Sequence, residues 1–177
     1  MASFRTALKH SIAGNYINIV IQLIASLIIA RLLTPSEFGL YSVALVFALI
    51  GELLKDFGVT NYVIKEKKLT TLKLETANSI LWILALIISL SLTFSAPFVA
   101  DFYRAEELEI LLYILSVNIL LAPLGTIVRA LLMRDLNFKV TSYISVIAQI
   151  LNVVTTLSLA YAGFGVYSLP TGLIVGS

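Results

Sequence analysis

Uncharged polar side chains recur at helical spacing inside two long apolar segments of the sequence. In segment 11–33 and again in segment 140–162, they follow one another in steps of three or four residues. Such steps keep side chains on one face of a helix, so each set predicts a polar stripe. The stripes are Ser11, Asn15, Asn18, Gln22 and Ser26 in the first segment, and Ser142, Ser145, Gln149, Asn152 and Thr156 in the second.

Stripes of amides and hydroxyls can serve two purposes in an apolar environment. They can line a hydrated cavity that offers hydrogen bonds to a polar cargo, or they can hydrogen-bond one helix to another. Both interpretations stay open here. A weaker third face carries Asn118, Ala122, Gly125 and Arg129. Our candidate cavity residues are Asn15, Asn18, Gln22, Asn118, Ser145, Gln149 and Asn152.

Few charged residues lie near the apolar segments, and each has a functional and a structural interpretation. Arg31, Lys55 and Arg129 are candidates for contact with an anion. Arg31 could instead extend to the membrane interface, and Arg129 could simply anchor the inner end of its segment. Glu52 is the deepest acidic residue and a candidate site for a coupling proton or cation. Ion pairing of Glu52 and Asp56 with Lys55 is the structural alternative.

Motifs for covalent or metal chemistry are missing from the sequence. It contains no cysteine and a single histidine, His10, which leaves no thiol chemistry and no cluster of zinc ligands. It also lacks a glycine-rich phosphate loop with its lysine and an HExxH motif. We therefore expect no enzymatic activity, no catalytic residues, no metal and no cofactor. The run Lys65-Glu66-Lys67-Lys68 mixes acid with base, and we expect no nucleic-acid partner.

The elements that carry these residues are too apolar for a water-soluble protein. Of 177 residues, 59% are hydrophobic and 12% charged, whereas soluble domains carry about 25% charged residues. Crossing a bilayer takes about 20 mostly apolar residues per helix. The expected spans are 11–33, 37–54, 77–99, 109–128 and 140–162, with a partial sixth at 166–177. We predict an all-α membrane bundle forming one domain over residues 1–177, and a fragment of a longer protein, because the sixth span is incomplete.

Lysine and arginine are distributed unequally between the two sides of such a bundle. If the N-terminus is cytoplasmic, ten of these twelve residues lie on the inner side, and only Arg31 and Arg104 lie outside. Basic segments are retained in the cytoplasm. The sequence therefore predicts a multi-pass protein with a cytoplasmic N-terminus.

The connections between spans predict local geometry. Thr34-Pro35-Ser36-Glu37 is typical of a capping box with proline at the first helical position. So tight a turn predicts that the first two spans are antiparallel neighbours. We further expect four features: a second helix that continues to Ile64, a third span that ends at Pro97, a kink at Pro123, and a last outer turn made by Gly163 and Gly165.

Five motifs, in this order along the chain, resemble the polysaccharide transporter (O-antigen flippase) family. This family belongs to the MATE-like superfamily, which also holds the lipid II flippases. The motifs are Arg31–Tyr41 (RLLTPSEFGLY), Lys55–Ile64 (KDFGVTNYVI), Lys68–Thr70 with Thr76-Ala77, Arg134–Lys139 (RDLNFK) and Ala162–Leu169 (AGFGVYSL). Tyr167 stands where the family often has tryptophan, and Pro170 enters where a smooth helix is expected.

The resemblance implies the N-terminal lobe of a flippase that has two such lobes. Its implied activity is alternating-access transport of an undecaprenyl-pyrophosphate-linked oligosaccharide across the bacterial inner membrane, as in O-antigen and lipopolysaccharide biosynthesis. Implied partners are that lipid-linked oligosaccharide, membrane lipids, the second lobe or a second copy, and a polysaccharide polymerase. Two alternatives stay open: a multidrug or cation antiporter of the same superfamily, and a non-transporting scaffold in a polysaccharide assembly complex.

Overall fold

The computed structural model describes the backbone of residues 2–176 and the side chains of residues 14–176. Over this range the chain is helical throughout, without a strand, as the sequence predicts. The elements are α1 (Ala2–Leu32), α2 (Pro35–Asp56), α3 (Val59–Lys65), α4 (Thr71–Tyr103), α5 (Glu106–Leu121), α6 (Pro123–Arg134), α7 (Phe138–Tyr161), the 3-10 helix η1 (Gly165–Tyr167) and α8 (Ser168–Gly176).

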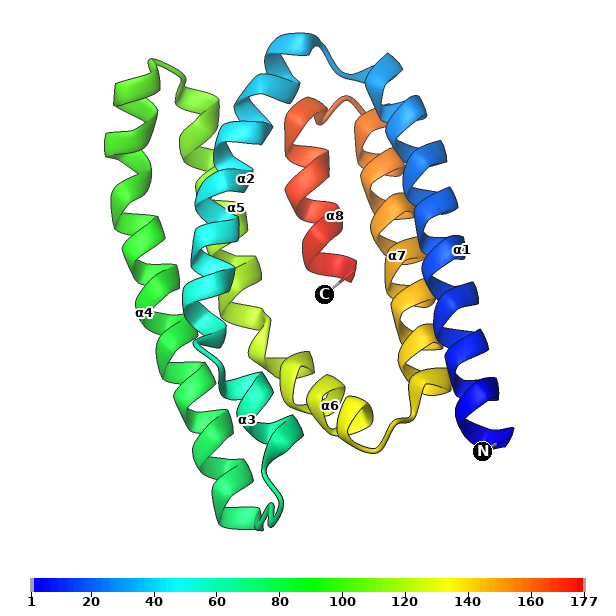
Figure 1. Cartoon of the computed structure of the whole chain (residues 1–177). Coiled ribbons are helices and arrows are strands. Elements are labelled where there is room, and N and C mark those ends of the chain that lie inside the picture. The colour runs from blue at the N-terminus through cyan, green and yellow to red at the C-terminus, as the bar shows by residue number, and fades with distance from the viewer. Residues whose placement is uncertain (1, 177) are drawn as a thin grey trace.

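The helices form two groups that are joined at both ends (Figure 1). One group consists of α2, α4 and α5, and the other of α1, α7 and α8. The short helices α3 and α6 lie at the end of the bundle that holds the N-terminus, where α6 crosses from α5 to α7 (Figure 1). Within the described residues, four helices are long and apolar enough to cross a membrane, and the bent pair α5–α6 can make a fifth. The chain is therefore a multi-pass membrane protein.

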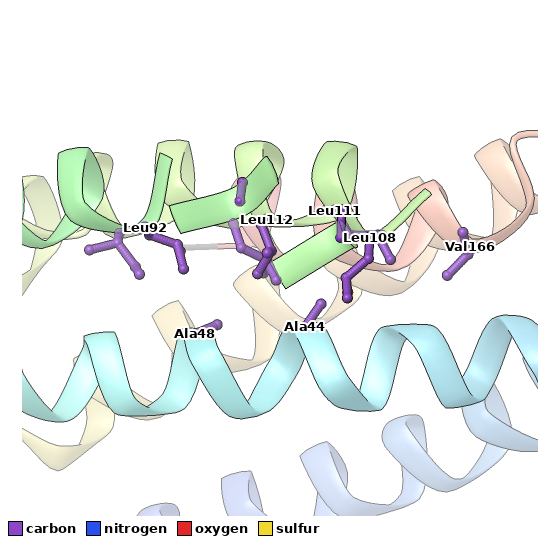
Figure 2. Packing of buried hydrophobic residues seen from close by; sticks show 11 residues of the cluster. Ala44, Ala48, Leu92, Leu108, Leu111, Leu112 and Val166 are labelled. Atoms are coloured by element: carbon purple, nitrogen blue, oxygen red, sulfur yellow. The ribbon is translucent and has the colours of Figure 1, made fainter. Parts of the chain in front are cut away.

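The largest core cluster joins α2, α4, α5 and α8 (Figure 2). Small residues recur on the buried face of α4, which consists of Ala77, Leu81, Ala85, Ser89, Leu92, Ala96 and Ala100. Such residues let helix backbones approach closely, and close packing is what drives helix association in lipid. The buried leucines of α5 fill the space opposite, among them Leu108, Leu111 and Leu112 (Figure 2).

The turn between α1 and α2 has the predicted capping box. The hydroxyl oxygen of Thr34 accepts from the backbone N–H of Glu37 at 3.3 Å, and the Glu37 carboxylate accepts from the N–H of Thr34 at 2.7 Å. The predicted pairing of the first two spans is nevertheless wrong. α1 packs along α7, and α8 lies between α7 and α5 (Figure 1). The polar stripe of α1 finds hydrogen-bonding partners on α7, which an apolar face of α2 cannot supply.

Two predictions about helix continuity are also wrong. α2 ends at Asp56, because Phe57 (φ 34°) and Gly58 (φ 82°) adopt left-handed conformations before α3 begins. Pro97 does not end the third span, since α4 continues to Tyr103. Proline is tolerated inside membrane helices when neighbouring groups satisfy the carbonyl that it leaves free.

The predicted kink at Pro123 and the predicted turn at Gly163 and Gly165 agree with the structure. Pro123 divides the fourth span into α5 and α6, whose axes are bent by 47°. Proline has no N–H to offer the carbonyl one turn earlier, so the helix breaks there. At the turn between α7 and α8, Gly163 (φ 86°) and Gly165 (φ 53°) adopt the left-handed conformations that favour glycine.

Candidate functional site

A cavity of about 480 Å³ lies between α1, α6 and α7, next to the turn that joins α6 to α7. Six of the side chains that line it are polar. They are Asn15 and Asn18 of α1, Arg129 of α6, and Thr141, Ser142 and Ser145 of α7. The remaining wall comes from glycines and apolar side chains, including Gly125, Leu132 and Phe138. We call this space the α1–α6–α7 cavity.

The break at Pro123 brings α6 to this cavity. α5 packs against α2 and α4, and a straight continuation of α5 would stay within that group. The 47° bend instead carries α6 across the end of the bundle to α7 (Figure 1). Gly125 and Arg129, four residues apart on one face of α6, thereby line the cavity.

The two predicted stripes face each other across the contact between α1 and α7. The Asn18 amide donates to the Ser145 hydroxyl at 2.8 Å, and the Gln149 amide donates to the Gln22 side-chain carbonyl at 2.5 Å. The stripes thus form interhelical hydrogen bonds, while Asn18 and Ser145 also line the cavity. Gln22 and Gln149 border a separate open groove on the α1–α7 pair. The side chain of Ser11 lies outside the described residues.

Unused polar groups point to what the cavity can hold. The side-chain oxygen of Asn18 is buried without a hydrogen-bond partner among the described residues. A buried acceptor of this kind costs about 1–3 kcal/mol unless water or a ligand donates to it. Among the residues whose side chains are described, no carboxylate lies within 4 Å of the Arg129 guanidinium. The cavity can therefore offer a positive charge and hydrogen bonds to a polar, anionic group.

Besides Gln22 and Gln149, two more of the predicted cavity residues lie outside the α1–α6–α7 cavity. Asn152 faces α8, where a Cβ on Gly172 would come within 3.1 Å of its side-chain oxygen. That oxygen accepts from the Thr156 hydroxyl at 3.3 Å, so the upper part of the second stripe belongs to the α7–α8 contact. Asn118 remains on α5, above the bend, and its side-chain oxygen is also buried without a partner among the described residues.

The other charged candidates do not reach the α1–α6–α7 cavity either. Lys55 lies on the buried face of α2, and its ammonium donates to Glu52 at 2.9 Å. The side chains of Lys55 and Glu52 are 5% and 51% exposed, so the pair neutralises charge at the edge of the core. Arg31 borders a shallow pocket with Tyr161 where α1 and α7 both end.

Several residues of the cavity were not among our candidates. Ser142 belongs to the predicted stripe, and its spacing could have identified it. Thr141 is adjacent to the stripe in sequence but one helical step off its face. Gly14 carries no such signal, yet it lets the helices approach so closely that a Cβ there would lie 2.9 Å from the Cβ of Ser142.

Comparison with known proteins identifies the family. A family model described as "Polysaccharide biosynthesis protein" matches residues 28–177. The chain belongs to this family. The match covers most of the chain and confirms the resemblance seen in its motifs, including the capping box and the α7–α8 turn. No solved structure matches the chain significantly.

Three curated relatives of the chain have transport or biosynthesis names. The chain is 33% identical over 153 residues to the succinoglycan biosynthesis transport protein ExoT of Rhizobium meliloti, covering 85% of this chain and 30% of that protein. It is 28% identical over 134 residues to the lipopolysaccharide biosynthesis protein WzxC of Escherichia coli, covering 74% and 27%. The teichuronic acid biosynthesis protein TuaB of Bacillus subtilis is 26% identical over 133 residues, covering 75% and 28%. The chain thus spans less than a third of the length of these relatives.

Proposed function

We propose that this chain is part of a transporter that moves an undecaprenyl-pyrophosphate-linked oligosaccharide across the bacterial inner membrane. The observation that carries the proposal is the α1–α6–α7 cavity, which combines an unpaired arginine with hydrogen-bonding side chains inside an apolar bundle. A sugar headgroup loses its hydrogen bonds to water when it enters about 30 Å of hydrocarbon. A polar cavity can replace those bonds while the lipid tail stays in the bilayer.

In this model, Arg129 contacts the pyrophosphate and the amides of α1 contact the sugar. A guanidinium forms bidentate hydrogen bonds with phosphate oxygens. Arg129 lies at the basic end of the bundle, which we place in the cytoplasm together with the N-terminus. Alternating access then requires a second lobe, or a second copy, opposite the cavity.

Replacement of Arg129 by glutamine in the complete transporter tests this assignment. Loss of a charged hydrogen-bonded contact of about 1.5–3 kcal/mol lowers transport roughly 10- to 100-fold at limiting substrate. The measurements are surface polysaccharide in cells and translocation of a labelled lipid-linked oligosaccharide in vesicles. The control is Arg104→Gln, in the turn between α4 and α5 and away from the cavity. Normal translocation by a correctly inserted Arg129→Gln protein would rule out the assignment.

A second pair of variants separates a cavity from interhelical packing. Asn18→Leu removes a side chain that lines the cavity and bonds to α7, whereas Gln22→Leu removes one that bonds to α7 outside it. If the cavity holds cargo, Asn18→Leu should reduce transport far more than Gln22→Leu at similar membrane abundance. Equal effects of the two variants would favour packing alone.

The antiporter alternative has less support. A multidrug or cation antiporter needs an acidic group at its binding site, and none of the described residues that line the cavity is acidic. Glu52 is instead paired with Lys55 on α2.

A further inference from the structure

A second concave site lies between α3 and the first turns of α4, apart from the α1–α6–α7 cavity. It has a volume of about 440 Å³, which is within the range of small-molecule sites in proteins. Its wall is mostly apolar and includes Phe57, Tyr62, Leu72, Lys73, Thr76 and Ile80. We call it the α3–α4 groove.

Contacts between α3 and the helices α4 and α6 hold α3 in place beside this groove. Val63 of α3 is completely buried against Ala77 of α4 and Ala130 of α6. The Arg134 guanidinium of α6 also donates to the backbone carbonyl of Val63 at 2.9 Å. Because these contacts hold α3 across α4 and α6, the space beside Tyr62 stays open.

The apolar wall of the groove is exposed. Phe57 is 81% exposed and Leu72 is 73% exposed, while Tyr62 and Ile80 are 43% and 42% exposed. The groove lies at the inner end of the spans, where tyrosine is enriched at membrane–water interfaces. Hydrocarbon chains are therefore the natural contact for this wall.

Lysines are concentrated in the turn between α3 and α4, next to the groove. Residues 59–73 contain four lysines and one glutamate, a net charge of +3. Lys73 is held by Glu66 at 2.7 Å and by the Lys68 carbonyl at 3.2 Å, which places the turn that contains Lys67 and Lys68 beside the groove. Among the residues whose side chains are described, neither Lys67 nor Lys68 forms an ion pair.

The N-terminal end of α4, which borders the groove, adds to the positive charge of the lysines. α4 starts at Thr71 and has no acidic residue in its first turn. The N-terminal end of a helix carries a partial positive charge, which an acidic side chain or a bound anion normally offsets. Glu66 offsets one lysine, and the remaining positive charge has no partner within the described chain.

We propose that the α3–α4 groove binds one anionic phospholipid of the surrounding leaflet, with an acyl chain along the apolar wall and the phosphate beside Lys67 and Lys68. A neutral lipid would leave the lysines unmatched, and a soluble anion would leave the apolar wall open. This lipid is a bound component of the protein, separate from any cargo. The inference rests on membrane insertion and does not depend on the transport model.

Fluorescence quenching in vesicles tests the proposal with the full chain. Trp82 is the only tryptophan, so Trp82→Phe combined with Tyr62→Trp places a single reporter in the groove. Brominated phosphatidylglycerol should quench this reporter at lower mole fraction than brominated phosphatidylcholine. Replacement of Lys67 and then Lys68 by glutamine should reduce the preference roughly fivefold per lysine, because each contributes about 1 kcal/mol. Lys139→Gln, on the same side of the membrane, serves as the control and should leave the preference unchanged.

Two further measurements separate the groove from a diffuse surface charge. Thr76→Phe fills the groove, so it should abolish quenching at position 62 by both lipids while leaving helical content intact. Inorganic phosphate at millimolar concentration should not displace the lipid. Equal quenching by the two lipids, quenching that survives Thr76→Phe, or full displacement by phosphate would each overturn the proposal.

Discussion

Replacement of Gly165 by alanine should destabilise the end of the bundle that holds the α1–α2 turn, through a clash with one carboxylate. Gly165 has a φ of 53°, and a Cβ built there would lie 2.5 Å from Oε1 of Glu37. The same carboxylate accepts from the backbone N–H and the hydroxyl of Thr34, at 2.7 and 2.8 Å. Glu37 thereby connects the α1–α2 turn to the turn between α7 and α8.

Two terms make up the expected cost. An alanine in the left-handed region costs about 1 kcal/mol relative to glycine. A shift of the Glu37 carboxylate that relieves the clash also disrupts its hydrogen bonding to Thr34, and losing one hydrogen bond to a charged group costs about 1.5 kcal/mol at this partly exposed position. The free energy of unfolding should therefore fall by about 2.5 kcal/mol. Gly163→Ala is the matched control, because Gly163 has a φ of 86° but no atom within 4 Å of its built Cβ, so only the first term applies.

The assay is equilibrium unfolding in mixed micelles, followed by circular dichroism, within a double-mutant cycle. In a Glu37→Ala background the carboxylate is gone, so Gly165→Ala should cost only about 1 kcal/mol. The coupling energy between the two positions should then be about 1.5 kcal/mol, the hydrogen-bond term alone. The reasoning is refuted if Gly165→Ala costs no more than Gly163→Ala, or if Glu37→Ala leaves its cost unchanged.

Three further perturbations test the packing and the charges of the bundle. Gly172→Ala should lower the free energy of unfolding by about 2 kcal/mol or more, because its Cβ would overlap the Thr156 hydroxyl of α7. Gly39→Ala, on α2 with no atom within 4 Å of its built Cβ, should raise the free energy of unfolding by about 0.5–1 kcal/mol. Equal effects of Gly172→Ala and Gly39→Ala on this free energy would contradict the close contact between Gly172 and Thr156. Pro123→Ala restores a backbone donor and should reduce the 47° bend, which spin-label distances between α5 and α6 would measure; unchanged distances would mean that tertiary contacts alone hold the bend. The hydrogen bond from the Lys73 ammonium lowers the pKa of Glu66 below the ordinary value of a glutamate. This pair should therefore stabilise the protein above that ordinary pKa and lose its effect as pH falls through the lower folded pKa. The difference in thermal midpoint between wild type and Glu66→Gln should accordingly shrink in acid, and a difference that grows would show that the sign is wrong.

The sequence predicts the local features of the fold well, because each depends on neighbouring residues. The capping box at Thr34 and Glu37 needs only four consecutive residues to form. The break at Pro123 follows from a missing backbone donor. Pro97 shows the limit of this reasoning: the same residue type breaks one helix and is accommodated in another, according to what surrounds it.

The site was predictable in part. The stripe residues Asn15, Asn18 and Ser145 do line the α1–α6–α7 cavity, since helical spacing identifies the polar face of each helix. Asn152 follows the same spacing but contacts α8. Periodicity assigns a residue to a face of its own helix and contains no information about which helix packs there.

The sequence by itself determined the medium, the class and the local geometry of this protein, because apolar length, helical periodicity and capping chemistry act within a few residues. Only the tertiary structure decided that α1 pairs with α7, although Asn18 and Ser145 are 127 residues apart in the chain. It also decided that the bend at Pro123 brings Arg129 to the cavity, and that Lys55 lies buried beside Glu52. The physical reason is that helix partners in lipid are chosen by shape and by matched hydrogen bonds, which exist only once both surfaces are built.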